Sequence, residues 1–281
     1  MFWQTSRYVI DLSRPRVMGI VNVTPDSFWD GGAWASTTGA LAHCEALVRA
    51  GVDILDIGGE SSRPGATRLA DEDELRRVMP VLHGALGLGV PVSVDTCKAA
   101  VMRAALDAGA DIVNDIRALR EPGALGTVAA HPACGVCLMH MQGEPASMQH
   151  APAYAGDVVG EVVAFLGERV TAAVGHGIDR ARLIVDPGIG FGKRPEHNVA
   201  LLARQSELLA LGLPLLVGWS RKSTLGWLTG RPAAERLPSS VAAALAAVQL
   251  GAHVVRVHDV AATVDALKVW RAAGLGPALA A

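Results

Sequence analysis

The chain has 281 residues, of which 51% are hydrophobic and 19% are charged, and this balance is typical of a globular protein with a large core. Its formal net charge is −2, which excludes a strongly basic surface of the kind that binds nucleic acid or an anionic membrane. The sequence contains no apolar run of about 18 residues and its N-terminus lacks the pattern of a signal peptide, so we expect a cytoplasmic protein.

A strand-like apolar run that ends in a polar residue recurs along the whole chain. These runs end at Asn22, Asp56, Asp95, Asn114, His140, Asp186, Ser220 and His258. Most of them are followed by a segment of helical character, and this repetition predicts a (β/α)₈ TIM barrel whose strand ends surround one site. Since such a barrel takes about 250 residues, we expect residues 1–281 to form a single domain.

The first half of the chain is expected to supply four strands and two unusually long loops. A weak alternation over residues 3–12 predicts a short strand or hairpin that closes the floor of the barrel. Strands are then expected at residues 17–22, 54–56, 92–95 and 112–114, and helices at 37–50, from 71, 98–108 and 124–130. The loops after the first two strands exceed the usual length of about two to six residues, which is typical of lids or binding loops.

The second half of the chain continues the alternation. Strands are expected at residues 135–140, 183–186, 215–217 and 254–258, and helices at 156–174, from 197, after 222, 239–250 and from 259 to about 273. Cys134 and Cys137 form a CxxC pair at the start of the fifth strand. Because no second pair accompanies them, two buried thiols are favoured over a zinc or redox site.

A glycine-rich segment, Asp186-Pro-Gly-Ile-Gly-Phe-Gly-Lys193, follows the sixth expected strand. A P-loop would need glycine where Pro187 stands and Ser or Thr where Arg194 stands, and a dinucleotide fingerprint would need the spacing Gly-x-Gly-x-x-Gly. We therefore interpret the segment as a turn that leaves Asp186 bare at the strand end and places Phe191 over a pocket.

Three acidic side chains, Asp56, Asp95 and Asp186, are expected at the mouth of the barrel, with Asn114 between them. Carboxylates in a partly dry site are costly unless they are paired or hydrogen-bonded. Either they form salt bridges with Arg or Lys, or they bind a ligand rich in N–H donors. The opposite half of the rim is expected to carry the basic residues Arg63, Lys222, Arg256 and His258. This combination favours a substrate with a donor-rich heterocycle at one end and phosphate at the other.

The segments that hold these residues resemble the dihydropteroate synthase family, the pterin-binding enzymes of folate biosynthesis. They follow the family's order and lie within residues 17–260. The segments are Met18–Phe28, Asp56–Gly65, Ser93–Thr96, Asn114–Ile116, Met139–Met141, Asp186–Lys193, Ser220–Ser223 and Arg256–Val260. A single motif of this kind would be weak evidence, but all of them together make a chance match very improbable.

The resemblance implies a transferase that joins 6-hydroxymethyl-7,8-dihydropterin diphosphate to p-aminobenzoate and releases 7,8-dihydropteroate and diphosphate. It implies catalytic roles for Asp95, Asp186, Lys222 and Arg256. The pterin ring would be bound by Asp95, Asn114, Asp186 and Lys222. The arylamine needs no strong general base, so catalysis is expected to be electrostatic and positional.

The resemblance also implies where diphosphate and a Mg²⁺ cofactor bind. Diphosphate would be bound by Asn22, Arg63, Arg256 and His258, and Mg²⁺ by Asn22 and Asp26. Mg²⁺ usually takes few protein ligands and completes its octahedron with phosphate and water. Metal and cations together would absorb the growing charge of the leaving diphosphate, which favours a largely dissociative step.

The p-aminobenzoate site is implied to form mainly from the loops. Its residues would be Phe28, Ser62, Pro64, Phe191, Lys222 and Ser223. Aromatic and apolar side chains would enclose the ring, and the helix beginning at Ser223 would receive the carboxylate at its N-terminus. Sulfonamides mimic this substrate and are expected to compete for the site. The resemblance also implies a homodimer.

Two other functions remain open at this point. A pterin-binding methyltransferase that acts on a corrinoid protein would share the acidic floor, but it would need neither a diphosphate site nor the Ser220-Arg-Lys-Ser223 segment. A non-catalytic paralogue that binds pterin would be indicated by loss of Asn22, Lys222 or Arg256, and all three are present.

Overall fold

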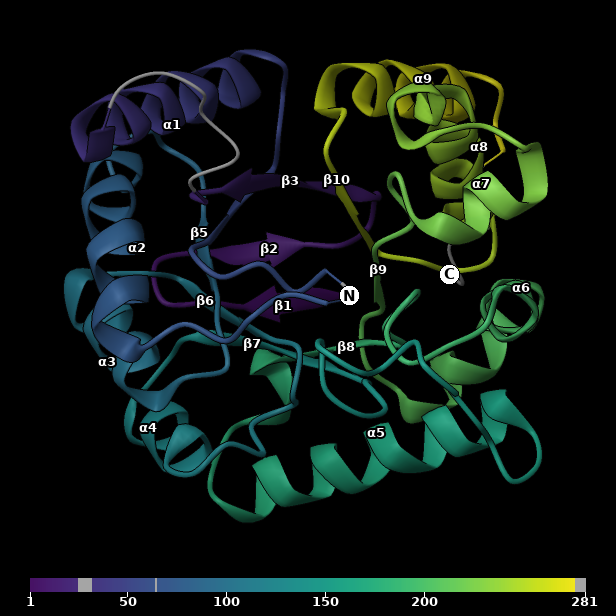
Figure 1. Cartoon of the computed structure of the whole chain (residues 1–281), viewed down its shortest axis with the longest axis horizontal. Helices are drawn as coiled ribbons and strands as arrows, with labels where there is room; N and C mark the ends of the chain where they lie inside the picture. Colours follow the sequence, from purple (N-terminus) through teal and green to yellow (C-terminus); the bar gives the residue numbers. More distant parts are fainter. Residues whose placement is uncertain (25–31, 64, 276–281) are drawn as a thin grey trace.

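The computed structural model describes residues 1–24, 32–63 and 65–275, with the backbone alone for residues 32–36. Within these ranges, eight parallel strands form a barrel with helices around it (Figure 1). The strands are β3 (Arg16–Asn22), β4 (Ile54–Gly58), β5 (Val92–Asp95), β6 (Ile112–Asp115), β7 (Gly135–Met139), β8 (Leu183–Asp186), β9 (Leu216–Val217) and β10 (Val254–Val257). Their order is β8-β7-β6-β5-β4-β3-β10-β9, and a bridge between Val185 and Leu215 joins the two ends. The predicted TIM barrel is confirmed.

The helices alternate with the barrel strands and form the outer layer. They are α1 (Gly32–Arg49), α2 (Asp71–Ala85), α3 (Ala99–Ala108), α4 (Ala124–Ala130), α5 (Val158–Gly175), α6 (Pro195–Ala203), α7 (Ser223–Thr229), α8 (Leu237–Gln249) and α9 (Val260–Ala272). Short 3₁₀ helices, η2 (Arg180–Arg182), η3 (Gln205–Leu211) and η4 (Ala233–Glu235), join some of these elements. The bounds of β5, β8 and α4 are those predicted, whereas α1 begins five residues before the expected residue 37.

The N-terminal residues close the lower end of the barrel. Strands β1 (Phe2–Gln4) and β2 (Val9–Asp11) pair as an antiparallel hairpin that lies across the barrel (Figure 1). Trp3 is completely buried and its indole Nε1 donates a hydrogen bond to the carbonyl oxygen of Arg182, 2.8 Å away. This confirms the predicted hairpin and leaves the carboxyl end of the barrel as the end where ligands can enter.

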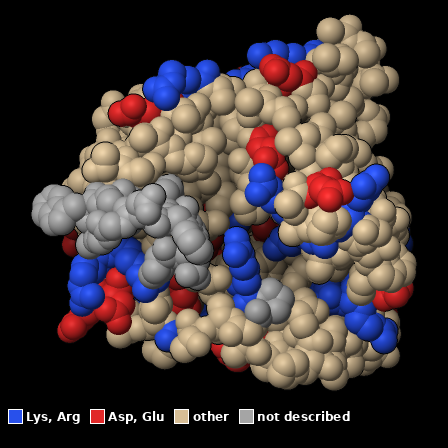
Figure 2. Space-filling model, turned by 45° about the horizontal axis from the view of Figure 1, so that its top comes forward, with Lys and Arg blue, Asp and Glu red and all other residues tan. Residues whose placement is uncertain are grey.

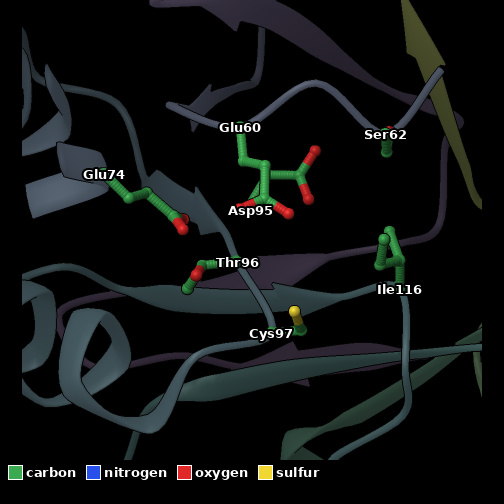
Figure 3. Close-up of a pocket in the computed structure, with 7 residues that line it drawn as sticks. All are labelled: Glu60, Ser62, Glu74, Asp95, Thr96, Cys97 and Ile116. Atoms are coloured by element: carbon green, nitrogen blue, oxygen red, sulfur yellow. The ribbon is translucent and has the colours of Figure 1, made fainter. Parts of the chain in front are cut away.

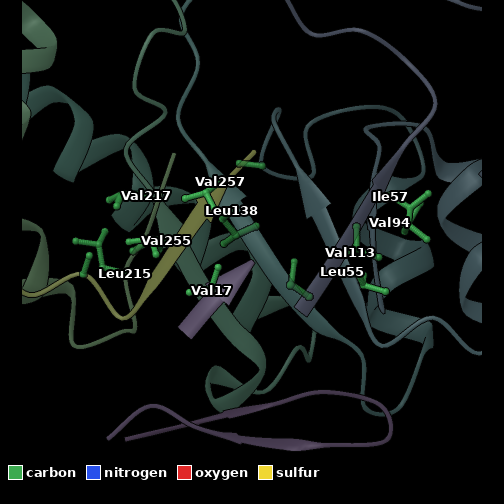
Figure 4. Packing of buried hydrophobic residues seen from close by; sticks show 14 of the residues in the cluster. Val17, Leu55, Ile57, Val94, Val113, Leu138, Leu215, Val217, Val255 and Val257 are labelled. Carbon is green, nitrogen blue, oxygen red and sulfur yellow. The ribbon is translucent and has the colours of Figure 1, made fainter. Parts of the chain in front are cut away.

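Residues of the barrel strands alternate between two hydrophobic layers. Val17, Leu55 and Val94 belong to the outer layer between strands and helices (Figure 4). Met18 and Ile54, their neighbours in sequence, belong to the inner layer with Trp3. This period of two is the pleat of a strand buried on both faces. Each buried aliphatic side chain contributes about 1.5–3 kcal/mol, so the layers fix the strands and thereby the polar residues at their ends.

The surface carries charges of both signs. Lys and Arg residues lie interspersed with Asp and Glu over the visible face in Figure 2, in keeping with the net charge of −2. No helix in the described part of the chain is both long and apolar enough to span a membrane. The four cysteines, Cys44, Cys97, Cys134 and Cys137, are buried and free, as predicted for the CxxC pair.

Candidate active site

Polar ends of neighbouring strands meet at the mouth of the barrel. Gly58 of β4 pairs with Asp95 of β5, which in turn pairs with Asn114 of β6. Asp56 lies two residues before Gly58 and is completely buried. Its Oδ2 accepts a hydrogen bond from the side-chain amide of Asn114 at 3.1 Å. The barrel register therefore brings the predicted polar residues of β4, β5 and β6 together.

Arg256 of β10 lies among these acids rather than on an opposite edge. Its Nε donates to Oδ2 of Asp56 and its Nη2 to Oδ2 of Asp95, both at 2.6 Å. The sequence interpretation that separated an acidic floor from a basic rim is wrong for this residue. The physical reason is that a buried carboxylate needs a counter-charge, and the alternative of salt bridges applies to Asp56 and Asp95. Oδ1 of Asp56 is buried and has no hydrogen-bond partner among the described residues.

Asp186 is stabilised differently. It ends β8, is 5% exposed, and its Oδ1 accepts a hydrogen bond from the backbone N–H of Gly188 at 2.7 Å. Burial raises the pKa of Asp186 to about 6, against the opposing effects of that hydrogen bond and of Lys222. Burial likewise raises the pKa of Asp95 to about 7, and the Arg256 guanidinium opposes the shift. The pKa values of both carboxyl groups therefore lie near neutral pH, where a hydrogen bond from a bound N–H donor can change their ionisation.

Lys222 lies over an aromatic ring instead of beside a carboxylate. Its Nζ is 4.1 Å from the centroid of the Phe191 ring, and burial together with Arg256 lowers its pKa to about 8. Lys222 immediately precedes α7, and Ser223 is the first residue of that helix. The structure therefore brings together Phe191, Lys222 and Ser223, three of the residues expected to bind p-aminobenzoate.

The turn after β8 requires glycine. Gly188, Gly190 and Gly192 all have positive φ, at 66°, 82° and 62°, where other residues are strained. A Cβ atom at Gly188 would overlap the carbonyl oxygen of His140. This close approach accounts for the glycine spacing and confirms that the segment is a turn. The prediction that the turn leaves Asp186 bare is wrong, because the Gly188 N–H donates to its carboxylate, and Phe191 lies in a buried cluster with three methionines.

His258 follows β10 and is hydrogen-bonded to Ser220. The backbone N–H of His258 donates to Oγ of Ser220 at 3.1 Å, and its Nδ1 lies 3.0 Å from the same oxygen. Burial and the neighbouring Arg256 lower the pKa of His258 to about 4. At neutral pH His258 can therefore offer an N–H to an anion but not a positive charge.

The loop after β4, residues 59–70, is fixed at its neck. Oε2 of Glu60 accepts from Nζ of Lys98 at 2.5 Å and from the backbone N–H of Leu69 at 2.9 Å. Lys98 also donates to Oε2 of Glu74 at 2.6 Å. The pocket beside this neck is shown in Figure 3, and its lining residues are Glu60, Ser62, Glu74, Asp95, Thr96, Cys97 and Ile116. Ser62 of the loop thus shares a pocket with Asp95 of the barrel.

Comparison with known proteins gives consistent matches over nearly the whole chain. A family model described as pterin binding enzyme matches residues 18–258. The chain is 53% identical over 279 residues to the dihydropteroate synthase of Neisseria meningitidis serogroup B, covering 97% of this chain and 98% of that protein. The chain belongs to the dihydropteroate synthase family of pterin-binding enzymes.

Solved structures of this family have the same fold. Xanthomonas albilineans dihydropteroate synthase with 4-aminobenzoic acid matches with a TM-score of 0.90 at 54% identity, over 96% of each chain. The same enzyme in complex with 7,8-dihydropteroate matches with a TM-score of 0.87 at 52% identity, over 96% of this chain and 97% of that chain. Yersinia pestis dihydropteroate synthase in a sulfonamide drug complex matches with a TM-score of 0.91 at 47% identity, over 98% and 99%.

Other residues expected from the family resemblance lie outside the hydrogen-bonded cluster or outside the described residues, although Asn22 pairs with Gly58 at the same barrel mouth. Arg63 is exposed on the loop after β4, and Asn22 is half-buried at the end of β3. Asp26, Phe28 and Pro64 lie outside the described residues. Within the described ranges, no group of three or more His, Cys, Asp or Glu side chains is arranged to hold a metal ion. The expected roles of these residues in this family member therefore stay predictions.

Two buried lysines with roles at the site were missed by the sequence interpretation. Lys98 fixes the neck of the loop after β4, and Lys193 lies inside the turn after β8. The sequence pattern indicates only a helix start for Lys98 and the end of the glycine-rich segment for Lys193. The only signal in the sequence was that each of these two lysines follows a predicted strand within a few residues. A lysine in that position can be either buried or exposed to solvent.

Proposed function

We propose that the chain condenses 6-hydroxymethyl-7,8-dihydropterin diphosphate with p-aminobenzoate to give 7,8-dihydropteroate and diphosphate. The observation that carries the proposal is the cluster of Asp56, Asp95, Asn114 and Arg256 beside Asp186 and Lys222, which offers acceptors and cations within one barrel mouth. The Xanthomonas albilineans relative, solved with 4-aminobenzoic acid and with 7,8-dihydropteroate, supports the same reaction.

The pterin end of the substrate would occupy the acidic side of the mouth. Asp186 and Asp95 can accept hydrogen bonds from ring N–H groups, and the unpaired Oδ1 of Asp56 is a further buried acceptor. A buried acceptor without a partner loses about 1–3 kcal/mol, so a donor-rich ligand would recover that loss. Asn114 would keep Asp56 oriented through its 3.1 Å hydrogen bond.

The diphosphate end would meet the positive side chains. In the reaction the C–O bond to diphosphate breaks and a C–N bond to the arylamine forms, and the amine loses a proton to solvent. Arg256 would move part of its contact from the carboxylates to the diphosphate, with Arg63 and an N–H of His258 as further donors. Lys222 would stabilise the charge that develops as diphosphate leaves.

We also propose that Asn22 contributes an oxygen ligand to Mg²⁺. Its side-chain amide oxygen is a hard donor, and Mg²⁺ takes one or two protein ligands together with substrate phosphate. The donor set therefore fits the ion, with Asp26 as the second expected ligand. When bound, Mg²⁺ would neutralise charge on the leaving diphosphate.

The p-aminobenzoate ring would lie against Phe191 and the stem of Lys222. These two side chains already face each other at 4.1 Å, and Ser223 follows Lys222 at the start of α7. Ser62, Phe28 and Pro64 are proposed to complete the site, as the family resemblance implies. Sulfonamides should compete here, in keeping with the sulfonamide drug complex of the Yersinia pestis enzyme.

A homodimer is proposed as the working assembly. Trp227 and Leu228 on α7 and Leu237 on α8 are exposed by 57%, 55% and 42%. Large apolar side chains on adjacent helices are typical of an interface. Light scattering should give twice the chain mass of 29.2 kDa, and the mass of a single chain would refute the assembly.

Diphosphate release in the presence of both substrates and Mg²⁺ tests the proposed function. We expect release that depends on p-aminobenzoate and produces dihydropteroate. Pterin binding without release would support a non-catalytic paralogue. Methyl transfer from methyltetrahydrofolate to a corrinoid protein would support the alternative methyltransferase.

A further inference from the structure

Lys193 is a buried lysine that forms no ion pair with a carboxylate among the described residues, and burial lowers its pKa to about 7. Its side chain is 2% exposed, and its Nζ lies 2.8 Å from Nδ1 of His140, 3.0 Å from the carbonyl oxygen of Gly188 and 3.1 Å from that of Phe191. Placing an ammonium group in the protein interior is costly unless its N–H donors are used. Here all of them point at one strand end and one turn.

His140 is the matching acceptor. It directly follows β7, and burial together with Lys193 lowers its pKa to about 2, so its ring is neutral. A neutral imidazole can accept a hydrogen bond at one nitrogen. The backbone of His140 is fixed as well, because its N–H donates to the carbonyl oxygen of Asp186 at 2.9 Å. Lys193 therefore connects the turn after β8 to the neighbouring strand β7.

The turn that Lys193 holds carries two contacts of the site. The Phe191 ring lies under Nζ of Lys222, and a Cβ atom at Gly190 would lie 3.1 Å from Cδ of Lys222. The outer side of the turn is held separately, since Gly190 N–H donates to Oδ1 of Asn198 at 2.8 Å. From the inner side, Lys193 bonds the carbonyls at both ends of the Gly188–Phe191 segment.

We propose that Lys193 is a positioning residue for the p-aminobenzoate side of the site, acting through Phe191 and Lys222. The inference rests on the proposed function, because it assigns the Phe191–Lys222 pair to that substrate. Asp186 is affected less, because it accepts no hydrogen bond from Lys193 and its backbone is held by the pairing of β8 with β7. Lys193 acts on its carboxylate only through longer-range charge, as the last and smallest of the effects that lower its pKa. The effect of removing Lys193 should therefore be unequal between the two substrates.

The experiment compares Lys193→Met with Arg182→Met by steady-state kinetics and by calorimetric binding of each substrate. Arg182 is a matched control because it is also a buried cation bonded to carbonyl oxygens, those of Cys134 and Val128, at the floor of the barrel. For Lys193→Met we expect the KM for p-aminobenzoate to rise about tenfold, with pterin affinity changed less than about threefold, because oriented hydrogen bonds to the turn are lost.

Arg182→Met should lower the melting temperature but leave the KM for p-aminobenzoate and the affinity for pterin unchanged. Equal changes for both substrates in Lys193→Met, or an unchanged KM for p-aminobenzoate, would overturn the proposal. Lys193→Gln, which keeps an N–H donor, should recover part of the affinity. If neither Lys193 variant folds while Arg182→Met does, the role is structural and the proposal is wrong.

Failure of the proposed function would look different. A wild-type protein that releases no diphosphate would refute the reaction, whereas binding of p-aminobenzoate in the presence of pterin and diphosphate would still report the effect of Lys193.

Discussion

Arg256 and Lys222 lie in the same barrel mouth, but their charges are balanced in opposite ways. Arg256 is bonded to two carboxylates at 2.6 Å, so Asp56 of β4, Asp95 of β5 and Arg256 of β10 form a network in which the charges are balanced. Lys222 lies over the Phe191 ring and forms no ion pair among the described side chains, and its pKa falls to about 8. The difference indicates that one cation contributes to folding as well as binding, while the other depends on a ligand for its partner.

Removing the compensated cation should have the largest effect. We expect Arg256→Ala to reduce kcat/KM by about a thousandfold, because a donor to the leaving diphosphate is lost. It should also lower the free energy of unfolding by about 3–5 kcal/mol, because Asp56 and Asp95 are left unpaired. Kinetics and denaturant unfolding measure the two effects. Arg256→Lys keeps the charge but cannot bridge both acids. Its kcat/KM and its free energy of unfolding should therefore lie between those of the wild type and Arg256→Ala.

Removing the uncompensated cation should separate activity from stability. Lys222→Ala is expected to reduce kcat by about a hundredfold, with a melting temperature equal to or above that of the wild type, because a half-buried cation without an ion pair does not favour folding. Circular dichroism and thermal melting check the fold. A variant that unfolds would show that Lys222 is structural, and the contrast with Arg256 would be wrong.

Replacing Asp186, the acceptor at the end of β8, tests whether this end of the site binds the pterin ring. Asp186→Ala should weaken pterin binding by about a hundredfold, because the ring loses a charged acceptor in a dry site. Calorimetry with a pterin measures the change, and p-aminobenzoate binding serves as the control. Unchanged pterin affinity would refute the assignment of Asp186.

The pH dependence of pterin binding gives a smaller effect with a definite sign. Because the pKa of Asp186 is raised to about 6, its carboxylate is present above that pH and becomes protonated below it. Pterin affinity should begin to fall near pH 7 as Asp95, with a pKa of about 7, becomes protonated. Protonation of Asp186 should add a further fall of about tenfold per unit below about pH 6. Asp186→Asn should remove that part of the dependence. A wild-type affinity that rises with acidification would contradict the assigned pKa and role.

Much of the barrel could be predicted from the sequence because strands, helices and turns depend on residues close together in the chain. The bounds of β5, β8 and α4 follow from apolar runs and their polar ends, and the turn after β8 follows from the glycine spacing. Contacts between distant residues could not be read in this way. Arg256 meets Asp56 from 200 positions away, and only the closed ring of strands brings them together.

The buried lysines were missed for a similar reason. The residues next to Lys193 and Lys98 in the sequence do not indicate that these lysines are buried. Their burial depends on how loops fold back over strand ends. Arg256 was predicted on the basic rim but is paired with Asp56 and Asp95. Predicting this pairing would have required knowing which charged groups are removed from water in the folded barrel. Roles assigned to Asn22, Arg63 and Asp26 still rest on the family resemblance.

A crystal structure with a pterin and diphosphate bound tests the shared barrel mouth most directly. We expect the pterin ring N–H groups to contact Asp186 and Asp95, and Arg256 to contact the diphosphate in the same cavity as Lys222. Diphosphate in a separate cavity, with Arg256 still bonded only to Asp56 and Asp95, would contradict this arrangement.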